Sequence, residues 1–260
     1  MSGPRRGGAA PGRRTRERPE PAADPERPVI YGRNAVREAL AAGRRTVHRV
    51  WATSGAASES WIAAAGVPVD LAAADEIARR SGVSDHQGVC ADVAAYPYVS
   101  ADILLGGPAP LIVALDEIQD PQNLGSICRT AECAGAAGVV ICERRAARVT
   151  PAVGKASAGA IEHLAIAPVR NLADFLAMGK ASGCWCYGAA ADGRPGYAET
   201  DFAGGVILVL GAEGRGLRPR VADACDALIA LPLHGRIESL NVGAAAAALL
   251  YGILQSRADA

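Results

Sequence analysis

The chain has almost no lysine, and its aromatic content is low. Lysine occurs only at Lys155 and Lys180, so nearly all of the positive charge is arginine, and 27 basic side chains balance 27 acidic ones. Nucleic-acid-binding domains usually have a basic excess, so the total charge does not favour such a partner. Arginine is the better planar ligand for phosphate. As a general bias, however, the abundance of arginine, alanine and glycine is typical of a GC-rich genome.

Three other features that the sequence lacks exclude classes of protein. The longest apolar stretch, near the C-terminus, is short and contains Gly243 and Gly252, which indicates a core helix and no membrane span. No apolar segment follows the N-terminal arginines, so we expect no secretory signal. The seven cysteines are scattered and odd in number, which favours reduced thiols in a cytoplasmic protein. The pair Cys184 and Cys186 has no second pair or histidine cluster beside it, so we expect no metal site.

Composition divides the chain into four parts. Residues 1–28 are rich in arginine, proline and glycine without an apolar period, which predicts a disordered tail that either contacts RNA phosphates or is merely solvated. Residues 29–97 alternate short helices and strands in a small α/β unit. Residues 98–108, with their Gly-Gly-Pro ending, are predicted to be a linker. Residues 109–260 form a second domain, and half of all residues are hydrophobic, which is ample for a core.

Strand and helix patterns alternate through the second domain, and we detect no internal repeat. This alternation predicts an α/β fold with a mostly parallel sheet covered by helices. The predicted strands are 111–115, 138–142, 164–169, 184–189, 206–210 and 227–233. The predicted helices are 124–137, 151–163, 172–182, 218–224 and 242–255, with a loop at 120–126 before the first.

Three segments place glycines and polar side chains at the ends of predicted strands. In the first, Asn123 starts a helix on which Ser126 and Arg129 share a face, and Gly125 permits a close approach of backbone or ligand. Ligands of open α/β sheets bind at the carboxyl edge, where this helix begins.

The second and third segments have the same character. Residues 210–217 hold three glycines and one carboxylate, Glu213, in a spacing that is neither a dinucleotide fingerprint nor a P-loop. Residues 231–243 deliver Ser239 and Asn241 to the start of the last helix, where both residue types are good caps. Three such strand ends can converge on one pocket.

These segments resemble the three signature motifs of the SpoU-type RNA ribose 2′-O-methyltransferases, of the TrmH family in the SPOUT superfamily. They read N-L-G-S-I-C-R-T-A (123–131), L-V-L-G-A-E-G-R-G-L (208–217) and L-P-L-H-G-R-I-E-S-L-N-V (231–242), in the family's order. The likeness spans about 109–257. Residues 29–96 resemble the family's ribosomal-protein-like, RNA-binding substrate domain, on Tyr31-Gly-Arg-Asn-Ala-Val and His86-Gln87-Gly88. The layout is most similar to the members that methylate a guanosine of 23S ribosomal RNA.

The resemblance implies a trefoil-knotted catalytic domain and a cytoplasmic homodimer with the active site at its subunit interface. The implied cofactor is S-adenosylmethionine. The implied cofactor-binding residues are Gly211, Leu231, Leu240, Leu210 and Leu233. The implied catalytic residues are Arg129, Asn123, Glu213, Ser239 and Asn241. An arginine stays protonated and is a poor general base, so we interpret Arg129 as a clamp on the substrate phosphate and 2′-oxygen, held by Glu213.

The departures from the motifs are small, and three alternatives remain. Gly243 and the alanines after it occupy positions where relatives often carry serine or valine, and Glu238 is less typical. One alternative is a transfer-RNA methyltransferase of the same family. Another is an RNA-binding ribosome-assembly factor without catalysis, although Arg129 and Asn241 are both present. The third, a nicotinamide-dependent oxidoreductase, conflicts with the glycine spacing.

Overall fold

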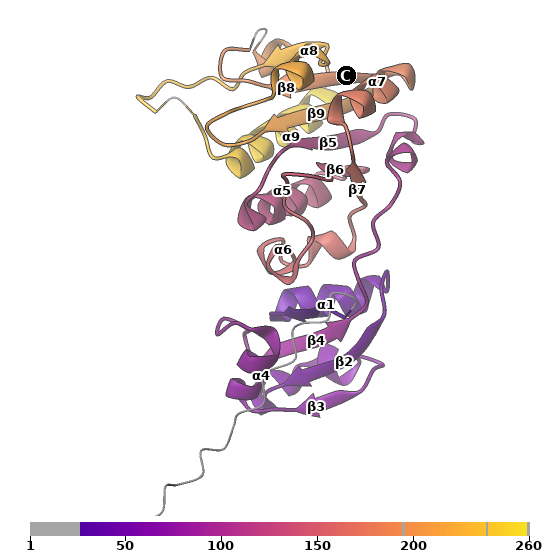
Figure 1. The fold of residues 1–260 in the computed structure, drawn as a ribbon, viewed down its shortest axis with the longest axis vertical. Helices are drawn as coiled ribbons and strands as arrows, with labels where there is room; N and C mark the ends of the chain where they lie inside the picture. Colours follow the sequence, from indigo (N-terminus) through magenta and orange to yellow (C-terminus); the bar gives the residue numbers. More distant parts are fainter. Residues whose placement is uncertain (1–26, 194–195, 238, 259–260) are drawn as a thin grey trace, which may run out of the picture.

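The protein is described by a computed structural model that covers residues 27–193, 196–237 and 239–258. Nearly all of the predicted tail and the atypical Glu238 lie outside these residues. Two domains are stacked along the longest axis of the molecule, with the smaller, N-terminal one at the bottom of Figure 1. In the described residues, none of the helices combines the length and the apolar character that a membrane crossing requires.

The small domain packs four helices on a four-stranded sheet of order β1-β4-β2-β3. Strand β4 is antiparallel to both β1 and β2, whereas β2 and β3 are parallel. Two short helices follow β2, and the first is capped by Thr53, whose side chain accepts a hydrogen bond from the Ala56 amide. The strands are β1 (Val29–Tyr31), β2 (Val47–Ala52), β3 (Val69–Leu71) and β4 (Val89–Val93), and the helices are α1 (Arg33–Ala42), α2 (Ser54–Ala57), α3 (Ser60–Ala63) and α4 (Ala74–Ser81).

The large domain has a six-stranded sheet of order β10-β8-β9-β5-β6-β7, in which every pair of neighbouring strands is parallel. The prediction of a mostly parallel α/β domain after a small α/β unit is therefore confirmed. The strands are β5 (Leu111–Asp116), β6 (Gly138–Cys142), β7 (Ile166–Val169), β8 (Cys184–Ala189), β9 (Gly205–Gly211) and β10 (Ala227–Ile229). The helices are η1 (Ala101–Leu105), α5 (Pro121–Cys133), α6 (Pro151–Ala156), η2 (Ala160–Glu162), α7 (Leu172–Ala181), η3 (Tyr197–Glu199), α8 (Pro219–Asp223) and α9 (Val242–Ala258).

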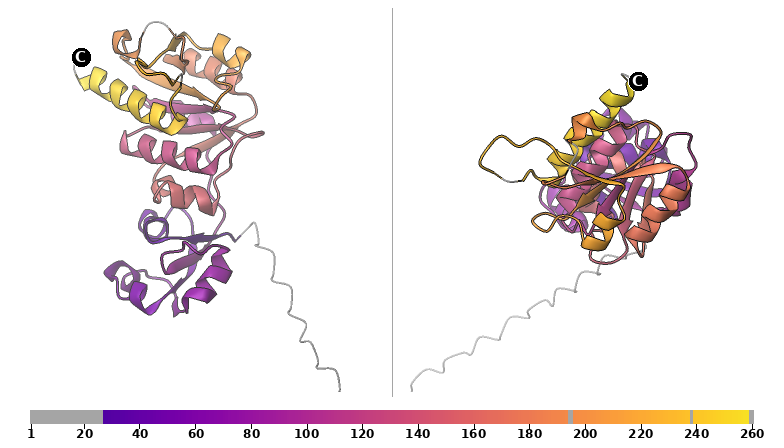
Figure 2. Two further views of the ribbon diagram at one scale, coloured as in Figure 1. Left: turned by 90° about the vertical axis from the view of Figure 1, so that its left-hand side faces the viewer. Right: turned by 90° about the horizontal axis from the view of Figure 1, so that it is seen from above.

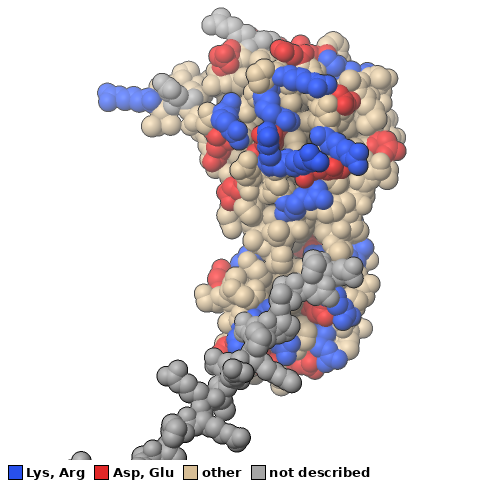
Figure 3. All heavy atoms as spheres, viewed as in Figure 1, with Lys and Arg blue, Asp and Glu red and all other residues tan. Residues whose placement is uncertain are grey.

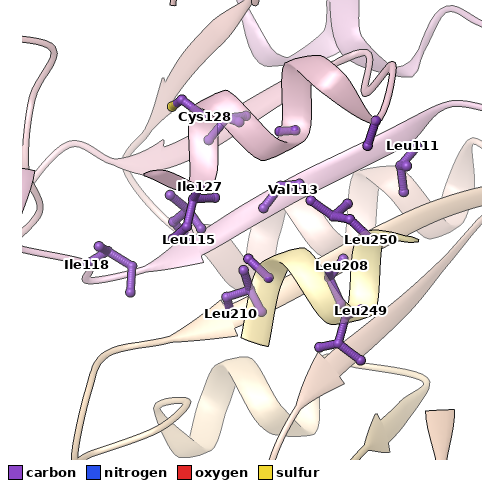
Figure 4. Close-up of a cluster of buried hydrophobic side chains, with 14 of the residues drawn as sticks. Leu111, Val113, Leu115, Ile118, Ile127, Cys128, Leu208, Leu210, Leu249 and Leu250 are labelled. Carbon is purple, nitrogen blue, oxygen red and sulfur yellow. The ribbon is translucent and has the colours of Figure 1, made fainter. Parts of the chain in front are cut away.

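Helices cover both faces of this sheet, which explains why its central strands are continuously apolar. On one face, Val113 and Leu115 of β5 pack with α5 and α9, through residues such as Ile127 and Leu250 (Figure 4). On the other face, Ile112 and Ala114 pack with α7 and α8. Helices α5 and α9 lie side by side on the first face (Figure 2). Passage of α9 through a loop of the chain stays a prediction of the resemblance.

Several predicted boundaries differ from the observed ones. Helix α5 begins three residues earlier than predicted, within the expected loop, because the Asp120 carboxylate accepts hydrogen bonds from the Gln122 and Asn123 amides and Pro121 fits the first turn. The predicted helix 151–163 divides into α6 and η2 at Gly159, whose φ is +88°. Strand β10 ends at Ile229, four residues early, and α9 extends to Ala258.

Candidate functional site

A cleft of about 790 Å³ opens at the carboxyl ends of β8, β9 and β10. Because these strands are neighbours in the sheet order and parallel, their carboxyl ends meet at one edge. The walls come from the strand ends, from the loop after β9 and from the first half of α9. The lining residues are Ala189–Ala191, Leu210–Gly216, Ile229, Leu231, Leu233, Ser239–Val242, Ala245 and Leu249.

All five residues predicted to bind a cofactor line this cleft: Leu210, Gly211, Leu231, Leu233 and Leu240. They come from two segments that are distant in sequence, the end of β9 and the chain between β10 and α9. Leu240 is 47% exposed. Apolar walls with accessible backbone are typical of a small-molecule site.

Gly211 permits the tight loop that forms one wall of the cleft. A Cβ atom at this position would lie 2.2 Å from the carbonyl carbon of Gly216, a distance that no side chain tolerates. The loop closes through a hydrogen bond of 2.8 Å from the Gly216 amide to the Ala212 carbonyl. Gly214 and Gly216 have φ values of +75° and +65°, which glycine adopts without strain. The spacing of these glycines therefore allows the chain to form a tight hairpin turn beside the cleft.

Asn123, Glu213 and Asn241 form a hydrogen-bonded group at the mouth of the cleft. The Asn241 Nδ2 donates to Glu213 Oε1 at 2.6 Å and to Asn123 Oδ1 at 2.9 Å. The Asn123 Nδ2 donates to the same Glu213 oxygen at 3.1 Å. One side chain from each of the three predicted segments is thus joined in a single group, as their strand-end positions predict.

Helix starts position the two amides of this group. Asn123 lies in the first turn of α5, directly after the Asp120 cap, and is 8% exposed. The Asn241 Oδ1 caps α9 by accepting hydrogen bonds from the amides of Gly243 at 2.9 Å and Ala244 at 3.3 Å. This cap turns the Asn241 Nδ2 towards Glu213.

The other two predicted catalytic residues lie outside this group. Ser239 lines the cleft. Arg129 is exposed on the surface of α5, and no ion pair or hydrogen bond joins it to Glu213. Within this chain the hydrogen bonds to Glu213 come from Asn123 and Asn241, so the clamp in which Glu213 holds Arg129 stays a prediction.

Sequence reasoning missed a buried ionic cluster at the end of β5. Asp116 and Glu117 are 1% and 5% exposed. Arg218 donates to Asp116 from its backbone amide at 2.8 Å and from its Nε at 2.7 Å, and this hydrogen bonding to Asp116 raises the pKa of Arg218. A second cavity, of about 190 Å³, lies beside the cluster and is lined by Glu117, Ile118, Gln119, Asp120, Asn123, Ala212, Glu213 and Arg215. The sequence signal for this cluster was the pair of consecutive acids, Asp116 and Glu117, after the apolar residues 111–115.

Metal-ligand groups and the thiol next to Arg129 were the remaining candidates for chemistry near the site. Across residues 27–193, 196–237 and 239–258, no group of three or more His, Cys, Asp or Glu side chains is placed to hold a metal ion. Burial raises the pKa of Cys128, on α5 next to Arg129, to about 12. A buried thiol with such a pKa stays protonated and unreactive at neutral pH.

Two sequence models of protein families match this chain. The SpoU rRNA methylase family matches residues 110–251, and the RNA 2′-O ribose methyltransferase substrate-binding family matches residues 29–99. The Bacillus subtilis protein YacO, named as a TrmH-family tRNA/rRNA methyltransferase, is 37% identical over 88% of this chain and 95% of its own length. A Staphylococcus haemolyticus protein of the same name is 35% identical over 88% and 96%.

Solved structures share the two-domain fold. The AdoMet-bound rRNA methyltransferase of Sinorhizobium meliloti superposes with a TM-score of 0.75 at 25% identity, over 88% of this chain and 87% of that one. A TrmH-family RNA methyltransferase structure from Porphyromonas gingivalis gives 0.72 at 28% identity, over 88% and 89%. The AdoMet complex of AviRb from Streptomyces viridochromogenes, at 24% identity, gives 0.77 and supports the fold alone.

The match to the SpoU rRNA methylase family spans more than half of the chain and includes the residues of the cleft and the Asn123–Glu213–Asn241 group. The match to the substrate-binding family covers the small domain. On this evidence the chain belongs to the SpoU rRNA methylase family and is an RNA methyltransferase.

Proposed function

We propose that this protein methylates a ribose 2′-hydroxyl of RNA with S-adenosylmethionine, and that its substrate is a guanosine of 23S ribosomal RNA. The observation that carries the proposal is the polar Asn123–Glu213–Asn241 group at the mouth of the apolar cleft. The family model of the small domain is that of RNA 2′-O ribose methyltransferases, and the structural neighbour from Sinorhizobium meliloti is AdoMet-bound.

The cleft fits the cofactor in size and character. Its volume of about 790 Å³ falls within the range of roughly 300–1,000 Å³ that is usual for small-molecule sites. Leu210, Leu231 and Leu240 offer apolar contacts, and the tight loop after Gly211 presents backbone groups. When bound, the cofactor supplies a methyl group already activated on a sulfonium.

The remaining task of the protein is to position the 2′-oxygen in line with the methyl group, which can contribute much of the rate. Asn123 and Asn241 fix the Glu213 carboxylate at the mouth of the cleft, and Ser239 stands on the cleft wall. Arg129 serves as a clamp on the substrate phosphate and the 2′-oxygen through its planar fork of donors. The proton leaves to that phosphate or to water.

The protein acts as a homodimer in this proposal. Helix α9 exposes Ala244, Ala248 and Tyr251 along one stripe, and Ile237 before it is 76% exposed. Large exposed apolar patches mark interaction sites. Arg129 on the neighbouring α5 is also exposed and makes no contact with Glu213 of its own chain. A second copy on this face would cover the stripe and place Arg129 at a shared site.

The choice of ribosomal RNA rests on the small domain and its likeness to ribosomal proteins. The relatives' names include both transfer RNA and ribosomal RNA, so a transfer-RNA target is the alternative that the experiment has to separate. A cytoplasmic location accompanies either substrate.

The test is transfer of labelled methyl from S-adenosylmethionine to unmodified total RNA, separated by size. We expect label in large-subunit ribosomal RNA, its loss with Arg129→Ala, and a strong reduction with Arg129→Lys, which keeps the charge but not the fork. Label in transfer RNA would refute the ribosomal target. No label in any RNA, with the cofactor still bound, would refute the activity. Near-full activity of Arg129→Lys would refute the clamp.

A further inference from the structure

We propose that Arg145 and Arg215, at the carboxyl edge of the sheet beyond the methyl-transfer site, bind backbone phosphates of the RNA next to the target ribose. The inference rests on the proposed function, because it names the surface along which that substrate lies. The two arginines come from loops after different strands, Arg145 after β6 and Arg215 after β9. Glu117, at the end of β5, stands between them.

Buried carboxylates organise this cluster. The side chain of Asp116 is fully buried and binds Arg218 through three donors. The Glu117 carboxylate lies 3.2 Å from Arg218, 3.8 Å from Arg145 and 3.9 Å from Arg215. Asp116 holds Arg218 firmly, so we assign Arg218 a positioning role.

Arg145 and Arg215 remain available for a ligand. Their side chains are 76% and 69% exposed. Their distances to Glu117 exceed the range of a hydrogen bond, and within the described residues neither guanidinium has another partner. Each therefore presents its planar set of donors to solvent, the geometry that binds phosphate with two parallel hydrogen bonds.

The backbone at this point is strained. Glu117 and Arg145 both have a φ of +57°, a left-handed conformation that side chains other than glycine rarely adopt. Such residues persist where the surrounding structure determines them, often at functional sites. The strain brings a buried carboxylate and an exposed arginine from adjacent strands to within 3.8 Å of each other.

The cluster adjoins the proposed catalytic group. Arg215 and Glu117 line the cavity of about 190 Å³ that Asn123 and Glu213 also line. Glu213 and Arg215 line the larger cleft as well. A nucleotide whose ribose sits at the Asn123–Glu213–Asn241 group would thus have its neighbouring phosphates near Arg215 and Arg145.

The carboxylates of the region do not cancel this role. Asp116 and Glu117 point inward, the Asp120 carboxylate is occupied by amides of α5, and Glu213 by Asn123 and Asn241. Glu143, after β6, is exposed but pairs with Arg170. Asp120 and Glu213 are exposed as well, so the arginines share this rim with carboxylates whose hydrogen bonds come from amides. Figure 3 shows blue side chains gathered on the large domain, on the face that Figure 1 presents.

The test is the salt dependence of binding between the full chain and a short, labelled, single-stranded RNA of mixed sequence, followed by fluorescence anisotropy. Log affinity falls with log salt concentration, and each lost phosphate contact reduces the steepness of that fall by about 0.7 on single strands. We expect Arg145→Ala and Arg215→Ala each to lower the slope by about that amount, and the double variant to lower it by their sum. Thermal unfolding checks that the variants are folded.

Arg220→Ala is the matched control. Its side chain is 76% exposed, equal to that of Arg145, but it pairs with the exposed Asp174 of α7 and not with Glu117. An unchanged slope in the folded double variant would overturn the proposal, as would an equal fall with Arg220→Ala, since the attraction would then be diffuse. Absence of methyl transfer by the wild-type protein would refute the proposed function separately, because the slope is measured without catalysis.

Discussion

The Asn241 side chain acts on two elements at once. Its oxygen caps α9 through the amides of Gly243 and Ala244, and its Nδ2 donates to Glu213 and Asn123. The cap fixes the orientation of the amide, since a flipped side chain would lose both sets of hydrogen bonds. The start of the last helix therefore determines where the Glu213 carboxylate stands.

We predict that Asn241→Asp separates these two tasks. Aspartate keeps the capping oxygen but places a second carboxylate where the 2.6 Å hydrogen bond to Glu213 was. Two adjacent carboxylates raise the pKa of one of them, so the stability of the variant relative to the wild type should be highest at low pH and fall as the pH rises through that raised pKa. Methyl transfer should fall on the order of 10²-fold, because the reacting groups are misplaced.

Thermal unfolding at pH 5 and pH 8, with methyl-transfer rates, measures this prediction. The matched control is Asn241→Ser, in which a good capping residue introduces no charge. Its loss of stability relative to the wild type should be the same at both pH values. An aspartate variant with wild-type activity would show that the Asn123–Glu213–Asn241 group does not position the reaction.

The convergence of Asn123, Glu213 and Asn241 was predictable from their positions at strand ends. The five cofactor residues came from the family resemblance, and all of them line one cleft. The Asp116–Arg218 pair was not predictable from the sequence, because the two residues are 102 positions apart and no local pattern links them. The exposure of Arg129 was not predictable either, since only the packing of α5 on the sheet determines which side of the helix faces solvent.

At the scale of elements, α5 and α6 pack at a distance that depends on Gly125. A Cβ atom at Gly125 would lie 2.4 Å from the Ala156 Cβ and 3.0 Å from the Ser157 amide nitrogen. Backbone atoms cannot move aside as a flexible side chain does. The glycine in the first motif thus serves helix packing at this position.

We predict that Gly125→Ala lowers the free energy of unfolding by about 1–3 kcal/mol, the usual cost of overpacking. The control is Gly55→Ala in α2, where an added Cβ would meet nothing within 4 Å. That change should be neutral or stabilising, because alanine restricts the unfolded chain. Urea denaturation compares the variants, and equal effects would contradict the packing argument.

Element boundaries were predictable where a cap has a local signature. Asp120-Pro121 starts α5, and the pattern of a capping acid followed by proline was present in the sequence although the predicted helix began later. The short helices α2 and α3 and the division between α6 and η2 were not predictable, because tertiary contacts select them. At Gly159, a Cβ would lie 2.7 Å from the Glu38 side chain of the other domain.

At the scale of the whole molecule, the two domains meet through polar contacts, of which the Arg45–Glu162 pair is buried. Arg45 of the small domain binds Glu162 of η2, and the two side chains are only 4% and 2% exposed. The Tyr96 hydroxyl lies 2.8 Å from the carbonyl oxygens of Ile161 and Leu164, and burial raises its pKa. His163 lies 2.9 Å from Glu38. These contacts fix the substrate-binding domain relative to the cleft.

We predict that Glu162→Gln lowers the free energy of unfolding by about 3–5 kcal/mol, because it leaves the buried Arg45 charge without its partner. The double variant Arg45→Met, Glu162→Leu should recover most of that loss, since well-packed apolar residues can replace a buried ion pair. Urea denaturation of the full chain measures both. Asp75→Asn, which removes an exposed pair with Arg79 on α4, should change little. If Glu162→Gln cost no more than Asp75→Asn, the buried pair would not hold the domains together, and the relative position of substrate domain and cleft would depend on the remaining contacts of Tyr96 and Glu38.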